Sequence, residues 1–116
     1  MPVNLYDSAY GLEKAVRQSE EYSLLKQAYD EVNADQSAKD MFENFRNIQL
    51  QLQQKQMMGQ NISEEEVTQA QKSVALVQQN AKISKLMEAE QRMSMVIAEM
   101  NKIIMKPLEE LYGSVQ

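Results

Sequence analysis

The sequence predicts an all-α protein: a long antiparallel helical hairpin preceded by two shorter helices, about five helices in total. Gly (3) and Pro (2) are scarce among the 116 residues, and the residue types that favour helices are abundant. Apolar residues recur at helical spacing along most of the chain, whereas the alternation typical of strands is missing. A chain of this length is expected to form one helical domain, residues 1–116.

Two short helices are predicted at the N-terminus, over residues 5–18 and 20–33. Asn4 is a suitable N-cap for the first helix, because its side chain can accept hydrogen bonds from free backbone N–H groups. The second helix is predicted to start at Ser19. The apolar stripes of the two helices are Leu5, Ala9, Leu12 and Val16, and then Tyr22, Leu25, Tyr29 and Val32.

The next two helices are predicted over residues 36–58 and 64–79, joined by a short polar turn. Asp35 can cap the first of them, and Gly59 stands where a left-handed C-terminal residue is expected. Ser63 and Glu66 have the spacing of a capping box, in which each side chain bonds the other residue's backbone N–H. This is the sharpest local signal in the chain.

The last helix is predicted over residues 81–106. Asn80 either caps this helix or sits in a kink, so the sequence leaves open whether the two C-terminal helices are continuous. Pro107 lacks a backbone N–H and restricts the residue before it. We therefore expect Pro107 to end the helix and to open a separate terminal turn over residues 107–112.

Helix lengths predict an oligomeric bundle. At 1.5 Å per residue the helix over 36–58 is about 34 Å long, and a continuous helix over 64–106 is about 64 Å long. The shorter helix can therefore cover only about half of the longer one. The other half of the longer helix carries a broad face of Met, Ile, Leu and Val, which is costly to leave in water. We expect a homodimer or a dimer of dimers, with an interface formed by Leu86, Met93, Val96, Ile97, Met100, Ile103 and Ile104.

The composition argues against an enzyme. The chain has neither Cys nor His, so it lacks the commonest nucleophile–base and metal-ligand residue types. The Glu64–Glu66 triplet is interpreted as the acidic first turn of a helix. We therefore expect no catalytic residue, no cofactor and no metal ion. No secretory signal and no apolar run of membrane-spanning length is visible, so a cytoplasmic protein without membrane contact is expected.

The leading functional hypothesis is a non-catalytic protein–protein interaction or regulatory protein. The methionines of the long helix are interpreted as core or oligomer seam, with an adaptable partner-binding groove as the alternative. The runner-up function is direct nucleic-acid binding, provided that folding gathers Lys39, Arg46, Lys55 and Lys72 on one face. A net charge of −5 without a basic cluster disfavours that alternative.

The order of these features resembles the YlbF/YmcA family of small bacterial helical proteins, most closely its YheA-like branch. The motifs that carry the resemblance are Ser19-x-x-Tyr22, Asp35, Phe42 and Phe45, Gly59-Gln60, Asn80-x-x-Ile83-x-x-Leu86-x-x-Ala89-Glu90 and Pro107-x-x-x-x-Tyr112. It implies a helical oligomer without known enzymatic activity, in the cytoplasm of Gram-positive bacteria. Relatives act through protein partners in developmental regulation and in RNA processing. Some carry cysteines linked to an iron–sulfur cluster, and this chain has none.

Overall fold

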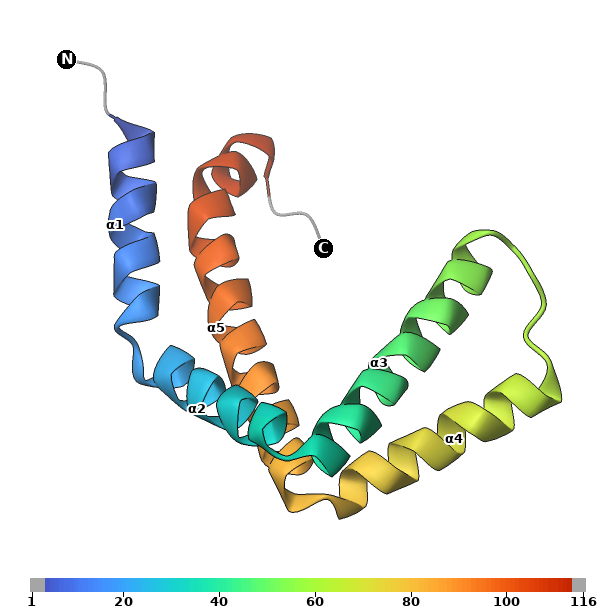
Figure 1. Cartoon of the computed structure of the whole chain (residues 1–116). Helices are drawn as coiled ribbons and strands as arrows, with labels where there is room; N and C mark the ends of the chain where they lie inside the picture. The colour runs from blue at the N-terminus through green and yellow to red at the C-terminus, as the bar shows by residue number, and fades with distance from the viewer. Residues whose placement is uncertain (1–3, 114–116) are drawn as a thin grey trace. The chain divides into compact units, whose positions relative to one another are not determined.

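The computed structural model describes residues 4–113, in which all regular secondary structure is helical. The helices are α1 (Leu5–Arg17), α2 (Glu20–Ala34), α3 (Gln36–Met57), α4 (Glu64–Gln79) and α5 (Ala81–Tyr112), shown in Figure 1. The predicted all-α class is confirmed, and the first four helices end within a residue of their expected bounds.

The chain divides into two compact units. We call residues 26–87 the hairpin unit, and residues 4–25 with 88–113 the described part of the terminal unit. Helices α2 and α5 each contribute residues to both units. The expectation of a single domain stays a prediction.

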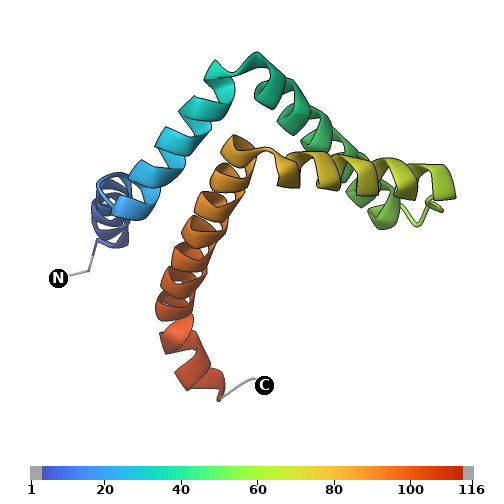
Figure 2. The ribbon, with the colours of Figure 1, turned by 90° about the horizontal axis from the view of Figure 1, so that it is seen from below.

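Helices α3 and α4 of the hairpin unit lie antiparallel beside each other, as the two views in Figures 1 and 2 agree. Each begins at a capping residue: Asp35 Oδ1 accepts a hydrogen bond from Ala38 N at 3.2 Å, and Ser63 Oγ accepts one from Glu66 N at 3.1 Å. The two arms therefore start where local side-chain bonds satisfy free N–H groups.

The turn between the arms begins with a Schellman motif. Gln60 N donates to Lys55 O at 2.8 Å, and Gly59 N donates to Gln56 O at 3.2 Å. Gly59 has a φ of 70°, which a residue without Cβ adopts at little cost. The glycine therefore allows the chain to reverse direction directly after α3.

The core of the described chain is concentrated in the hairpin unit. Its buried apolar side chains come from all four helices that contribute to this unit: Ala28, Val32, Ala38, Phe45, Val77, Ile83 and Leu86. Ser73 is buried with them, and its hydroxyl donates to Ala70 O at 2.8 Å, so its burial leaves no unsatisfied donor.

Two ion pairs connect the junction of α2 and α3 to the start of α5. Lys82 Nζ lies 3.1 Å from Asp35 Oδ2, and Lys85 Nζ lies 3.8 Å from Glu31 Oε2. The pKa of Asp35 is lowered, first by the hydrogen bond from the Ala38 backbone and then by the one from Lys82. Asp35 thus serves as both the N-cap of α3 and a tie to α5.

Asn80 separates α4 from α5. Its backbone is extended, its N–H donates to Val77 O at 3.2 Å, and its Oδ1 accepts from Ile83 N at 3.1 Å. One residue therefore closes α4 and caps α5, which settles the open question of continuity: the two helices are distinct.

Helix α1 of the terminal unit is well capped but buries none of its residues. Asn4 Oδ1 accepts from Tyr6 N and Asp7 N, both at 3.1 Å. Arg17 and Glu13 form an exposed ion pair of 2.8 Å one turn apart, and Glu13 raises the pKa of Arg17 through this hydrogen bond. Local bonds therefore hold the helix, whereas no buried side chain anchors it.

The prediction that the last helix ends at Lys106 is wrong. Helix α5 continues through Pro107 to Tyr112. Proline removes one backbone donor, the one that would bond the carbonyl of Ile103. Adding residues to an existing helix is far easier than nucleating a new one, so a long helix can continue past one missing bond.

Candidate interaction surfaces

Exposed apolar side chains gather on the terminal unit. Among the described residues, thirteen of the twenty large exposed apolar side chains belong to it. Only two of the nine buried apolar side chains do, Ala89 and Met93. The terminal unit therefore presents most of its apolar surface to solvent.

The structure separates the seven residues predicted for an oligomer interface into three groups. Leu86 (0% exposed) and Met93 (8%) are buried within the chain itself. Val96 and Met100 are half-buried. Ile97 (41%), Ile103 (64%) and Ile104 (60%) are exposed and remain available to a partner.

Sequence reasoning missed the C-terminal end of this surface. Ile97, Ile104, Leu108 and Leu111 recur at spacings of seven, four and three residues, which place them on one face of α5. We call these four residues the α5 stripe. The expected helix end at Pro107 hid its last two members, although their spacing was visible in the sequence. Further exposed apolar residues of this unit are Leu5, Tyr6, Tyr10, Leu12, Leu24, Met95, Met105 and Tyr112.

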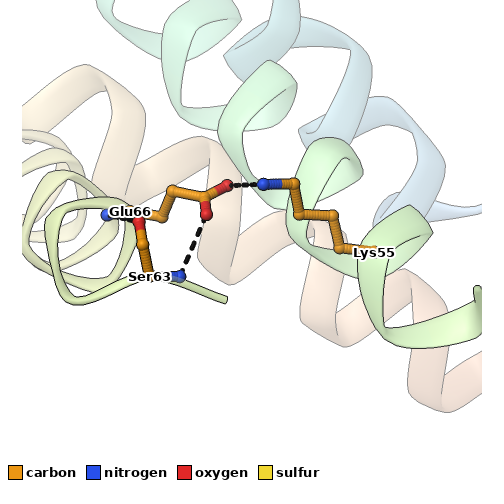
Figure 3. Close-up of polar contacts among 3 residues, drawn as sticks. All are labelled: Lys55, Ser63 and Glu66. Atoms are coloured by element: carbon orange, nitrogen blue, oxygen red, sulfur yellow. Dashed lines mark hydrogen bonds and ion pairs between the residues drawn. The ribbon is translucent and has the colours of Figure 1, made fainter. Parts of the chain in front are cut away.

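A cluster of polar side chains lies at the tip of the hairpin. Figure 3 shows Glu66 bridging two elements: Oε1 accepts from Ser63 N at 3.0 Å, and Oε2 contacts Lys55 Nζ at 2.5 Å. The hydrogen bond from Lys55, followed by that from the Ser63 backbone, lowers the pKa of Glu66 to about 2. The capping box of α4 is thereby joined to the end of α3.

Beside this bridge, the two arms border an open apolar pocket of about 410 Å³. The loop contributes Ile62, and α3 contributes Leu52 and Gln56. The residues from α4 are Val67, Ala70, Gln71 and Val74. The two arms therefore leave an apolar groove next to the loop that joins them.

The four cations required for the nucleic-acid hypothesis do not share one face. Arg46 and Lys55 are nine residues apart in α3, which places them on opposite sides of that helix. Lys55 is paired with Glu66, and the guanidinium of Arg46 lies 4.8 Å from the centre of the Phe42 ring. The arrangement gives no basic surface for a phosphate backbone.

Within residues 4–113, no cluster of acidic side chains is arranged to hold a metal ion. Nor is any helix in that range both long and apolar enough to cross a lipid bilayer.

Comparison with known proteins identifies the family of the chain. The sequence model described as "Control of competence regulator ComK, YlbF/YmcA" matches residues 5–109. The chain belongs to the YlbF/YmcA family. It is 74% identical to the UPF0342 protein YheA of Bacillus subtilis over 116 residues, which cover 100% of this chain and 99% of the relative. The resemblance to the YheA-like branch is confirmed.

Solved structures share the fold of this YlbF/YmcA-family chain. A DUF964 protein of unknown function from Bacillus stearothermophilus has a TM-score of 0.86 and 51% identity, with 97% of this chain and 98% of that chain covered. Bacillus subtilis RicA, crystallised in complex with RicF, has a TM-score of 0.67 and 20% identity over 94% and 96% of the two chains. The likeness to RicA shows a common fold.

Proposed function

We propose that this YlbF/YmcA-family chain is a non-catalytic regulatory protein that acts in the cytoplasm by binding other proteins, and that it forms a homodimer or a dimer of dimers. The observation that carries the proposal is the distribution of apolar side chains among the described residues. The terminal unit exposes thirteen large ones, whereas its buried apolar residues are Ala89 and Met93. Exposed apolar surface of this kind marks sites of association.

The α5 stripe is the centre of the proposed self-association surface. Burying one Ile or Leu side chain contributes roughly 1.5–3 kcal/mol, so four of them supply the scale of a stable contact. A second copy presents the same stripe, which allows a self-complementary two-fold interface. Family membership supports a regulatory role, and the fold relative RicA is a protein that has been crystallised with a protein partner.

The test is sedimentation velocity at micromolar concentration with Ile97→Glu/Ile104→Glu. Two carboxylates in the stripe should convert the oligomer to 13.4 kDa monomers that keep their helix content. The matched control is Leu50→Glu/Leu76→Glu, which changes two similarly exposed residues of the hairpin unit and should leave the oligomer intact. A wild-type chain that sediments as a monomer contradicts the proposed assembly.

Regulation through partners has its own test. Affinity capture from the native cell should recover a partner protein with the wild type. The same capture with Ile97→Glu/Ile104→Glu should not recover that protein. Partners in developmental regulation or RNA processing fit the family. Direct RNA binding that weakens steeply with salt, or substrate turnover that requires a carboxylate of this chain, contradicts the proposal.

A further inference from the structure

We propose that the groove between α3 and α4 is a second docking site, which takes an amphipathic helix of a partner protein with a Lys or Arg beside its apolar anchors. We call the pocket lined by Leu52, Gln56, Ile62, Val67, Ala70, Gln71 and Val74 the hairpin groove. It lies entirely within the hairpin unit and is separate from the α5 stripe. The inference rests on the proposed function only in that the chain works by binding proteins.

The groove has the size and lining of a site for apolar side chains. Its volume is about 410 Å³, and five of its seven lining residues are apolar. Val67 (43%) and Val74 (36%) remain exposed, so the groove formed by the two helices and the loop is open to solvent on one side. Small-molecule sites normally bury most of their ligand. A partner helix, by contrast, needs only an open apolar channel for its anchor residues.

The two edges of the groove differ in charge. On one edge, Lys55 and Glu66 neutralise each other. On the other edge, the groove residues of α4 continue toward the start of that helix at helical spacing: Val74, Gln71, Val67 and then Glu64. The Glu64 carboxylate therefore lies at the end of the hairpin groove. Glu65 is the next residue and points about 100° away. Glu64 is exposed and has no ion-pair partner among the described residues.

The charge of the hairpin tip and its flexible methionine side chains favour a cationic amphipathic helix as the occupant of the groove. Residues 49–75 carry two cations (Lys55, Lys72) and three carboxylates (Glu64, Glu65, Glu66), so the tip of the hairpin has a net charge of −1. A cation next to an apolar anchor complements this tip. Met57 and Met58, which are exposed at the end of α3, add adaptable apolar contact next to Gln56.

The same criterion disfavours a second copy as the occupant. Residues 88–112 of α5, which include the α5 stripe, carry five carboxylates and three cations, a net charge of −2. Helix α1 carries two of each and has a net charge of zero. Helix α3 carries three cations and two carboxylates, but one of these cations, Lys55, is already paired with Glu66. None of the three helices therefore offers an excess of unpaired positive charge to complement Glu64, so the favoured occupant comes from another protein.

The experiment uses the full chain and two labelled helical peptides of about 18 residues, long enough to form a helix. Both carry Leu at positions i, i+3, i+4 and i+7, flanked by Lys in one peptide and by Glu in the other. Fluorescence anisotropy should show binding of the Lys peptide at least about tenfold tighter than that of the Glu peptide, with a difference that narrows as salt rises. Amide chemical-shift changes should centre on Leu52, Val67 and Ala70.

Matched variants locate the site. Ala70→Phe fills the groove and should weaken binding about tenfold or more, whereas Gln69→Phe on the outer side of α4 should leave it unchanged. Glu64→Gln should weaken binding of the Lys peptide about 2–5-fold, and Glu65→Gln should not. Both carboxylates lie in the first turn of α4, so this pair separates groove charge from the helix dipole.

Three outcomes overturn the inference: equal binding of both peptides, shift changes outside the groove, or wild-type affinity in Ala70→Phe. Sedimentation distinguishes this failure from failure of the proposed function, because Ala70→Phe should keep the wild-type oligomer. Loss of the oligomer in that variant would identify a second copy as the occupant and contradict the proposal. Chemical-shift mapping on the wild type tests the site even if Ala70→Phe fails to fold.

Discussion

The hairpin unit and the terminal unit are built from similar amphipathic helices, but they use their apolar residues differently. The hairpin unit holds seven of the nine buried apolar side chains of the described chain. The terminal unit contains α1, which buries no residue, and the C-terminal half of α5, whose last twelve helical residues are all exposed. The contrast supports the proposal that the hairpin unit is stabilised by its own core, whereas the terminal unit is covered by a binding partner.

The largest expected effect comes from the same substitution made in each unit. Leu86→Ala removes a fully buried side chain of the hairpin unit and should lower the free energy of unfolding by about 2–5 kcal/mol. Leu111→Ala, at a 73% exposed position of the terminal unit, should change it by less than about 0.5 kcal/mol in dilute solution. Urea unfolding measures both, and equal losses would remove the distinction between the units.

A smaller effect is expected from the two helix caps. Ser63→Ala breaks the capping box of α4 and should cost about 0.5–2 kcal/mol, because α4 contributes to the core. Asn4→Ala leaves two N–H groups of α1 without their acceptor, yet α1 buries nothing. It should reduce helix content locally and shift global unfolding by less than about 0.5 kcal/mol. Circular dichroism and amide hydrogen exchange follow the two effects.

The dependence of the Tm on protein concentration is a still smaller effect, and it tests the terminal unit alone. If the α5 stripe associates, the Tm of the wild type should rise by about 2–5 °C per tenfold increase in concentration. The Tm of Ile97→Glu/Ile104→Glu should not depend on concentration. A wild-type Tm that is independent of concentration would mean that the terminal unit is stable without a second copy.

The smallest effect is expected from pH at the hairpin tip. The pKa of Glu66 is about 2 in the folded chain against an ordinary value of 4.5, so its contribution is present above pH 4.5 and is lost as the pH falls toward 2. Glu66→Gln should therefore flatten the fall of Tm between about pH 5 and pH 2. Asp35, whose pKa is also lowered, should leave a residual slope. An unchanged slope in Glu66→Gln contradicts the role of the Lys55–Glu66 pair.

The sequence predicts well those features that depend on a few neighbouring residues. The caps at Asn4, Asp35 and Ser63 and the left-handed Gly59 follow from side-chain chemistry within one turn of the helix end. Helix bounds are therefore accurate at these positions. The end of α5 is the exception, because a local rule for Pro107 competes with the propagation of a long helix.

The candidate surfaces were harder to predict, because exposure depends on which face of a helix meets the rest of the chain. Leu86, Met93 and Ile97 all belong to one broad apolar face of α5, and periodicity does not tell which of them other helices cover. The hairpin groove has no sequence signature at all. It arises from the spacing of two helices whose lining residues, such as Leu52 and Val74, resemble ordinary core residues.

The one-residue corner at Asn80 has a consequence for how this chain can change in length. The backbone and side chain of Asn80 form hydrogen bonds with Val77 on one side and with Ile83 and Ser84 on the other. These bonds leave no room for an additional residue between the two helices. An inserted residue there would turn the following helix by about 100° and carry Ile83 and Leu86 out of register with the core. The Gly59–Ile62 loop imposes no such phase, so insertions and deletions accepted during evolution should accumulate there.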